Sequence, residues 1–90
     1  MKQGIQAYRE QASFSDRRQQ EAMVRKYAPL VKKVAYRMVH RLPSSVEVED
    51  LISVGTIGLL QAFENFDDSK GTRFESFAEF RIKGAMLDEL

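Results

Sequence analysis

The chain has 90 residues, of which 43% are hydrophobic and 30% charged, a composition that fits one small globular domain and excludes disordered, collagen-like and membrane-spanning chains. It has no cysteine and one histidine, His40, which excludes disulfides and thiolate metal sites, so we expect no metal and no cofactor. Residues 1–41 carry ten Lys or Arg against three acids (+7) and residues 42–90 carry four against ten (−6), so the halves face different partners or neutralise each other.

Residues 1–14 are expected to form a flexible arm ahead of a domain that covers residues 15–90. The segment 5–12 can form a short helix, but it is polar and is followed by Ser13, Phe14 and Ser15. The N-terminal sequence MKQGIQAYRE has no hydrophobic segment of the signal-peptide kind, and no apolar run is long enough for a bilayer. We therefore expect a cytoplasmic protein without a membrane partner.

A first long helix is predicted from Asp16, with Ser15 as its N-cap. Pro29 interrupts its hydrogen bonds, so the helix either bends there or is two helices with Pro29 in the first turn of the second. Either way, we expect its two halves to meet at an angle. One buried stripe is predicted because apolar residues recur at intervals of three and four: Met23, Tyr27, Leu30, Val31, Val34, Met38 and Leu42.

A second helix is predicted over about residues 47–66, where Ser44 and Glu47 have the spacing of a capping box. Gly55 is expected to let a neighbouring backbone approach closely. The core face of this helix is predicted to comprise Val48, Leu51, Ile52, Gly55, Leu59, Ala62, Phe63 and Phe66.

A turn over residues 67–71 precedes a last helix, for which Thr72 and Glu75 form a second capping-box pair. Ala78, Ile82, Ala85 and Met86 are expected to pack that helix on the core. No strand pattern is present. The predicted fold class is all-α, a compact antiparallel bundle of three or four helices.

The second helix carries more apolar residues than one small core can use. Val54, Ile57 and Leu60 lie opposite the core face without an obvious internal partner. Val54, Ile57 and Gln61 follow one another by three and four, so they form a continuous ridge with Asp50 and Glu64 as its charged ends. Such a ridge is typical of a surface that docks on another helix or a coiled coil. Alternatively, the arm or the first helix covers it.

The last helix carries Phe74, Phe77 and Phe80 at intervals of three, among Lys70, Arg73, Arg81 and Lys83. Aromatics at this spacing usually belong to a core, and we assign Phe74 to the core. Steps of three rotate around a helix, so at least one of the three rings should be accessible. A ring of this kind beside cations can stack an unpaired base while the cations neutralise its phosphates, which favours single-stranded nucleic acid.

The segments DLISVGTIGLLQAFENFD and KGTRFESFAEFRIKGAMLDEL resemble domain 2 of the bacterial RNA polymerase sigma factors of the sigma-70 family. The resemblance extends over residues 23–90, and RLPSSVEVEDL with RIKGAMLDEL is most similar to the flagellar and motility (sigma-28-like) type. It implies a domain 2-like helical bundle over residues 15–90 and a role in transcription initiation and promoter melting. It implies two partners, core RNA polymerase and the non-template strand of the promoter minus-10 element.

The resemblance also implies where these partners bind. The beta-prime clamp helices of polymerase are expected on one face of the second helix, with Ile57 of the ridge added to the family positions: Asp50, Ser53, Val54, Thr56, Ile57 and Leu60. Promoter DNA is expected on the following turn and helix, with the neighbouring cations Arg73 and Lys83 added: Lys70, Thr72, Arg73, Phe74, Phe77, Phe80, Arg81 and Lys83.

The chain departs from the family pattern at two places. Phe80 and Arg81 replace two adjacent tryptophans of housekeeping sigma factors, which implies a shallower base pocket. The chain also stops at Leu90, before the residues that read the duplex part of the minus-10 element, so we expect a fragment or a natural truncation. Met86, Leu87 and Leu90 would then lie exposed and promote self-association.

An enzyme is not expected, because the acidic pairs fit a turn and a helix N-terminus and no nucleophile, base and orienting group come together. Two functions remain open at this stage. One is the initiation module that binds polymerase and DNA. The other is a helical interaction domain or decoy that binds polymerase or an anti-sigma factor without engaging DNA.

Overall fold

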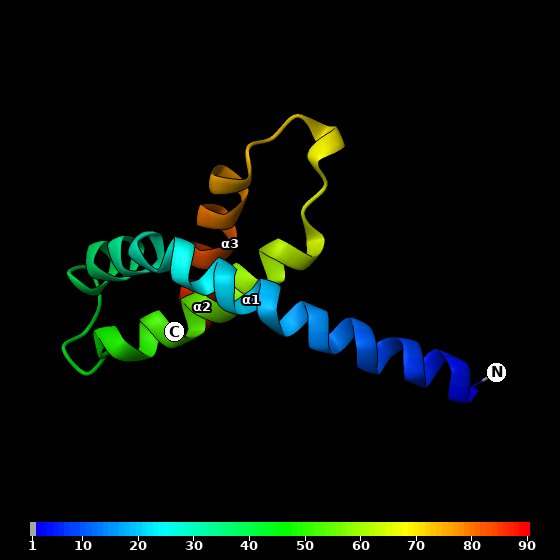
Figure 1. Ribbon diagram of the computed structural model, residues 1–90. Coiled ribbons are helices and arrows are strands. Elements are labelled where there is room, and N and C mark those ends of the chain that lie inside the picture. Colours follow the sequence, from blue (N-terminus) through cyan, green and yellow to red (C-terminus); the bar gives the residue numbers. More distant parts are fainter. Residues whose placement is uncertain (1) are drawn as a thin grey trace.

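The computed structural model describes the backbone of residues 2–90 and the side chains of residues 17–90. Three α-helices and one short 3-10 helix follow in the order α1 (Lys2–Val39), α2 (Val48–Asn65), η1 (Asp68–Lys70) and α3 (Phe74–Asp88) (Figure 1). No strand occurs in this described part of the chain. The predicted all-α bundle is confirmed, and α2 lies within one residue of its predicted bounds.

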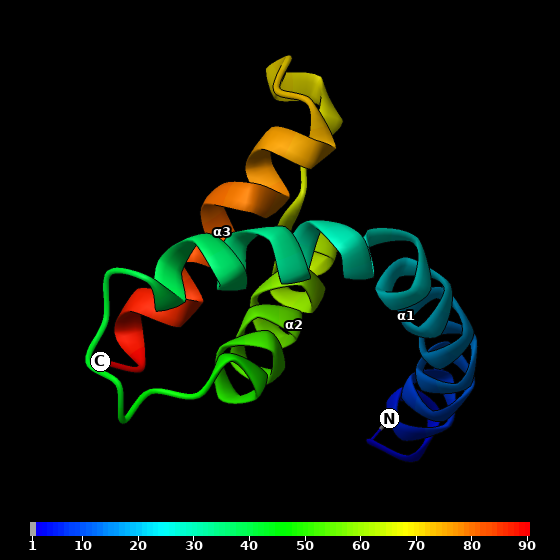
Figure 2. The same cartoon turned by 90° about the vertical axis from the view of Figure 1, so that its left-hand side faces the viewer.

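Helix α1 continues through Pro29 as one element. Figure 2 shows that it is bent, so that the part before the proline and the part after it point in different directions. The expected angle is therefore present, because proline supplies no N–H to the helix ladder. The expected start at Asp16 is wrong, since α1 begins at Lys2. Side chains of the predicted arm, residues 1–14, and of Ser15 lie outside the described residues.

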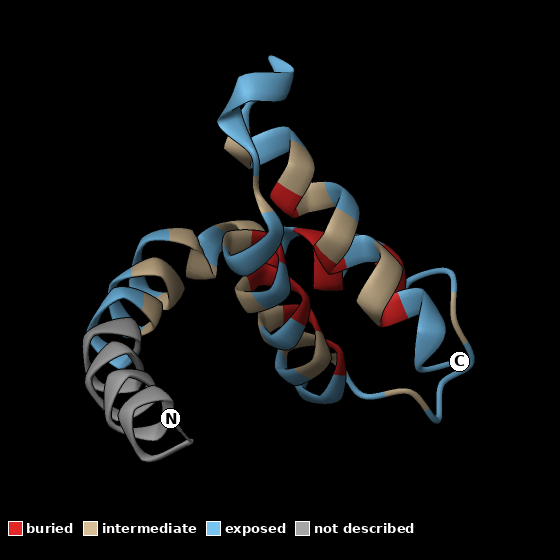
Figure 3. Cartoon of the chain, turned by 90° about the vertical axis from the view of Figure 1, so that its right-hand side faces the viewer, coloured by how far each residue is buried: buried red, intermediate tan, exposed pale blue. Residues whose placement is uncertain are grey.

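The core forms where the second half of α1 meets α2 and α3, and it appears as the red segments of Figure 3. The predicted stripe of α1 and the predicted core faces of α2 and α3 all contribute to it. Burying these side chains stabilises the fold by about 25 cal/mol for each Å² of apolar surface removed from water. The buried side chains are Val31, Val34, Ala35, Met38, Leu51, Leu59, Ala62, Ala78, Ile82 and Met86.

Two glycines of α2 allow the close crossing of α2 and α3. A Cβ atom at Gly58 would lie 2.8 Å from the Arg81 carbonyl oxygen and 2.9 Å from the Ala85 Cβ atom. At Gly55 a Cβ would instead meet side chains, foremost Met86 Cε. The backbone approach expected at Gly55 therefore occurs at Gly58, one turn later.

The helix N-termini differ from the two predicted capping boxes. Glu47 itself is the N-cap of α2 and makes no side-chain cap hydrogen bond, so Ser44 stands three residues too early. Arg73 is the N-cap of α3, which leaves Thr72 outside the helix. The turn at 67–71 is confirmed: Asp67 Oδ1 accepts hydrogen bonds from Ser69 N (3.0 Å) and Ser69 Oγ (2.6 Å), and Gly71 has the left-handed φ of 77° that favours glycine.

Within the described residues, none of the helices combines the length and hydropathy that crossing a bilayer requires.

Candidate protein-docking and nucleic-acid surfaces

The predicted polymerase-binding residues of α2 lie in three different environments. Asp50, Ser53 and Ile57 are exposed, and Ile57 shows 55% of its surface. Val54 is half-buried and packs against the core. Thr56 Oγ1 donates a hydrogen bond to the Ile52 carbonyl oxygen at 2.8 Å. Only three of the six residues predicted to bind polymerase are therefore exposed to a partner.

Leu60 faces α1. It lines a shallow hollow of about 550 Å³ together with residues of the first half of that helix, among them Arg17, Val24 and Arg25. Leu60 is half-buried beside α1, so the alternative that the first helix covers the ridge is met only in part at Leu60. It does not hold at Ile57, which stays exposed.

The predicted apolar end of α3 is only partly exposed. Leu87 and Leu90 show 50% and 60% of their surface, whereas Met86 is fully buried in the core. The expectation that all three lie exposed is wrong for Met86, because its side chain fills the space beside Gly55.

Phe74 and Phe77 belong to an aromatic cluster between α1, α2 and α3. The Phe74 ring lies 5.2 Å from Tyr27 and 5.2 Å from Phe66, in an edge-to-face contact with the latter. Phe77 lies 5.8 Å from Phe66. Both phenylalanines are half-buried and pack against the core, as expected for Phe74. Contacts of this kind stabilise a fold by about 0.5–1.5 kcal/mol beyond burial.

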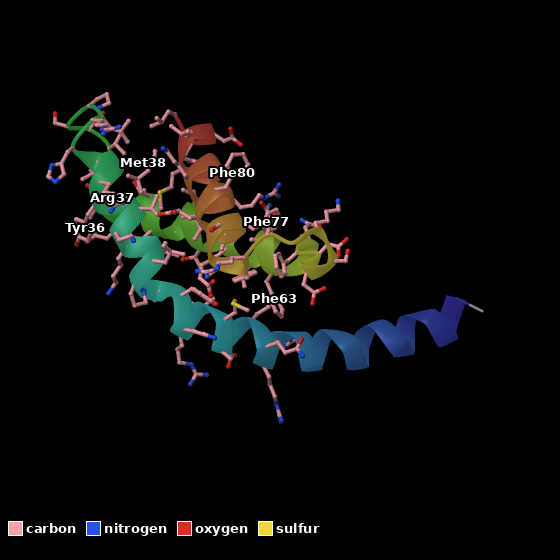
Figure 4. All side chains as sticks on the ribbon, turned by 90° about the horizontal axis from the view of Figure 1, so that it is seen from above. Tyr36, Arg37, Met38, Phe63, Phe77 and Phe80 are labelled. Atoms are coloured by element: carbon pink, nitrogen blue, oxygen red, sulfur yellow. The ribbon has the colours of Figure 1, made fainter. Side chains whose placement is uncertain are left out.

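Phe80 is different, because 75% of its surface is exposed. It lies on α3 on the side toward the second half of α1, and Figure 4 shows it apart from Phe77. The expectation that at least one of the three rings is accessible is confirmed by this residue. An exposed large ring on a charged helix is a surface on which another planar group can stack.

A hydrogen bond joins this aromatic cluster to the start of α3. Tyr27 Oη donates to Glu75 Oε1 at 3.0 Å. Burial, followed by the bond to Glu75, raises the pKa of Tyr27, and the same bond is the largest cause that lowers the pKa of Glu75. Glu75 thus binds α1 instead of completing the predicted capping box with Thr72.

The remaining predicted DNA-binding residues, four cations and Thr72, lie in three different environments. Lys70, Thr72 and Arg73 are exposed in the loop before α3. Arg81 is half-buried, with its carbonyl oxygen against α2 at Gly58. Lys83 is exposed on the same side as Phe80. The structure therefore brings Lys83 to Phe80, and leaves the loop residues at the far end of the helix.

Phe80 and Lys83 line a groove between α1 and α3, which we call the α1–α3 groove. It holds about 750 Å³ and includes charged side chains of the last turn of α1 and of the turn after it, which the sequence pattern did not predict as site residues. Two arginines four residues apart in the basic half of the chain were the available signal. The groove is lined by Val34, Arg37, Met38, His40, Arg41, Ser76, Glu79, Phe80 and Lys83.

Comparison with known families identifies the chain. The family model described as "Sigma-70 region 2" matches residues 23–90. The chain belongs to this family. The resemblance predicted from the two sequence segments is thereby confirmed.

Similar curated proteins are sigma factors of the flagellar type, as the sequence resemblance predicted. The chain is 55% identical over 71 residues to the RNA polymerase sigma factor FliA of Pseudomonas aeruginosa, covering 79% of this chain and 29% of that one. It is 54% identical over 65 residues to the protein of the same name of Escherichia coli strain K12, covering 72% and 27%. The chain thus spans less than a third of the length of these relatives.

A solved structure titled "Sigma-28(FliA)/FlgM complex" matches with a TM-score of 0.72 and 39% sequence identity, covering 84% of this chain and 33% of that chain. The sigma-type helical fold is therefore shown independently of the family model.

Proposed function

We propose that this chain is a transcription initiation module that binds core RNA polymerase and the single-stranded minus-10 element of promoter DNA. Membership of the sigma-70 region 2 family supports the proposal, as do relatives that are named RNA polymerase sigma factors. The observation that carries its DNA part is the exposure of Phe80 beside Lys83 on the rim of a groove rich in cations. The module acts in the cytoplasm, where polymerase works.

The proposed mechanism is non-catalytic. Extruding a base from a duplex costs a few kcal/mol, and stacking it on an aromatic side chain offsets this cost. Phe80 offers the stacking surface, because Phe74 and Phe77 are occupied by their contacts with Phe66. Melting is then driven by binding and needs no nucleotide hydrolysis.

The proposed polymerase contact is the exposed part of α2: Asp50, Ser53 and Ile57. Ile57 supplies apolar surface that is 55% exposed, and the two polar residues lie one and two turns before it. This combination suits a helix of the clamp. Of the other predicted contacts, Val54 packs against the core, Thr56 hydrogen-bonds to the Ile52 carbonyl oxygen and Leu60 lies beside α1.

The DNA part is tested by Phe80→Ala, with Tyr36→Ala as the matched control. Tyr36 is an aromatic residue of α1 that is 53% exposed and does not line the α1–α3 groove. In an anisotropy titration with short single-stranded DNA, we expect Phe80→Ala to weaken binding by about 1–3 kcal/mol, the contribution of one base stack. Equal affinities of wild type and Phe80→Ala would contradict base stacking there.

A second candidate function is binding of an anti-sigma factor without DNA. It is favoured by similar solved structures, which are complexes of sigma-28 with FlgM. The two functions are separated by salt-dependent DNA binding, which only the initiation module requires. Co-elution of the purified chain with core RNA polymerase is expected of the initiation module and also of a polymerase decoy.

A further inference from the structure

We propose that Arg37, in the last turn of α1, and Arg41, in the turn that follows it, bind phosphates of the DNA strand whose base stacks on Phe80, from the wall of the α1–α3 groove opposite α3. This inference rests on the proposed function and extends it to a helix outside the predicted DNA-binding set. It assigns a ligand to this groove of about 750 Å³.

The two walls of the groove carry complementary groups. Arg37 lies in the last turn of α1 and Arg41 in the turn that follows the helix, where its backbone N–H donates to the Met38 carbonyl oxygen at 2.9 Å. Both side chains are exposed and line the groove. Phe80 and Lys83 come from the opposite wall, on α3. Figure 4 shows Arg37 and Met38 on α1 across from Phe80 on α3. A strand in the groove would therefore have a ring on one side and cations on both.

The charge in the groove is not neutralised from within. Among the described residues, Glu79 is the only carboxylate that lines it, against Arg37, Arg41 and Lys83. Among the described residues, none of these four side chains forms an ion pair, whereas Arg25 on α1 pairs with Glu21 at 3.9 Å. The guanidinium donors of Arg37 and Arg41 are thus available to an anion.

Arginine suits a phosphate in particular, because its planar donors can form two parallel hydrogen bonds to the phosphate oxygens. An acidic peptide would satisfy the cations as well. It would leave the ring of Phe80 without a planar partner, and that ring is the most exposed large apolar side chain among the described residues. The combination of ring and cations therefore favours nucleic acid over an acidic peptide.

Position along α3 separates this site from the loop cations. Phe80 and Lys83 follow Phe74 by six and nine residues, which places them about 9–14 Å further along the helix at a rise of about 1.5 Å per residue. Lys70 and Arg73 lie before Phe74. The groove thus adds phosphate contacts to the strand beyond those that the loop can reach.

The test compares two double variants in the whole chain. Arg37→Gln with Arg41→Gln removes two charges from the groove. Lys32→Gln with Lys33→Gln removes two charges from exposed positions of α1 that do not line the groove. All four residues are exposed, so both variants should fold like the wild type, which circular dichroism verifies. Affinity for short single-stranded DNA is measured by anisotropy over a series of salt concentrations.

We expect the arginine variant to bind roughly tenfold more weakly at 0.1 M salt, and its log–log salt slope to be smaller by about 1.4, because a phosphate contact to single-stranded DNA contributes about 0.7. The lysine variant should keep nearly the wild-type slope. If the wild type binds and Phe80→Ala weakens it, but the arginine variant matches the lysine variant, this inference fails while the proposed function stands. If the wild type shows no salt-dependent binding, the proposed function itself fails.

A parallel titration with polyglutamate tests whether the groove binds an acidic peptide instead of DNA. Weak binding that is equal in wild type and arginine variant supports the assignment to DNA. Polyglutamate binding that depends on the two arginines, together with DNA binding that does not, would overturn it in favour of an acidic peptide.

Discussion

Phe74 and Phe80 show how two residues of one type, six positions apart, can have separate roles. Phe74 packs against Tyr27 and Phe66, whereas Phe80 exposes 75% of its surface. The first ring therefore contributes to the stability of the fold. The second contributes surface for a ligand.

This difference predicts that alanine substitutions at the two positions change the free energy of unfolding by different amounts. Phe74→Ala should lower the free energy of unfolding by about 2–4 kcal/mol, toward the lower end of values for buried phenylalanine because the ring is half-exposed. Phe80→Ala should change it by less than about 0.5 kcal/mol. Urea unfolding followed by circular dichroism measures both. A similar loss in the two variants would contradict the separation of roles.

The hydrogen bond from Tyr27 to Glu75 should make stability depend on pH at both extremes. The pKa of Glu75 is lowered in the folded state, so its stabilising contribution is present above the ordinary value of 4.5 and is lost as the pH falls through the folded value. The pKa of Tyr27 is raised, so its contribution is present below 10.0 and is lost as the pH rises through the folded value.

Tyr27→Phe keeps the ring against Phe74 and removes the donor, so it tests this bond alone. We expect the variant to be slightly less stable than the wild type at neutral pH. The difference should disappear in acid, where Glu75 is protonated in the folded state. Thermal unfolding at a series of pH values measures it, and a difference that persists unchanged in strong acid would show that the bond is not its source.

At the scale of elements, the periodic patterns predicted the helices well and their ends poorly. The core residues Val31, Leu51 and Ile82 follow directly from apolar spacing, because burial of a helix face leaves a strong repeat. Glu75 shows why the ends differ: its carboxylate forms a tertiary hydrogen bond, which local spacing cannot reveal. Arg37 and Arg41 were missed because a solvated cation and a cation lining a groove have the same sequence pattern.

The crossing of α2 and α3 predicts different effects for two glycines. Gly58→Ala would press a Cβ against the backbone of α3, 2.8 Å from the Arg81 oxygen, so it should destabilise the fold by about 1–3 kcal/mol. Gly84→Ala meets nothing within 4 Å and should stabilise α3 by about 0.5–1 kcal/mol. Denaturant unfolding compares them. Equal effects would mean that the helices do not cross as closely as described.

At the scale of the molecule, the two proposed contacts use different surfaces. The proposed polymerase surface lies on α2 around Ile57, and the proposed DNA surface lies around Phe80 on α3 and along the end of α1. Residues buried between the three helices fix the positions of both. Ligand at one surface therefore does not obstruct the other, as a domain that holds polymerase and promoter together requires.

The uneven charge of the sequence has a related explanation. Arg37 and Arg41, in the basic half, form no ion pair with the acidic half among the described residues. Neutralisation between the halves therefore does not account for these two charges. An external anion is the partner that the geometry allows.

Because the two proposed surfaces are separate, a substitution on α2 should weaken polymerase binding without weakening DNA binding. Asp50→Ala with Ile57→Ala removes one charge and one exposed apolar side chain from α2, so we expect weaker retention on immobilised core RNA polymerase. DNA affinity should stay unchanged, because neither residue lines the α1–α3 groove. The matched control is Glu49→Ala with Leu87→Ala, which removes the same kinds of group at exposed positions outside the proposed contact. Wild-type retention of the first variant, or equal loss in both, would place the polymerase contact elsewhere.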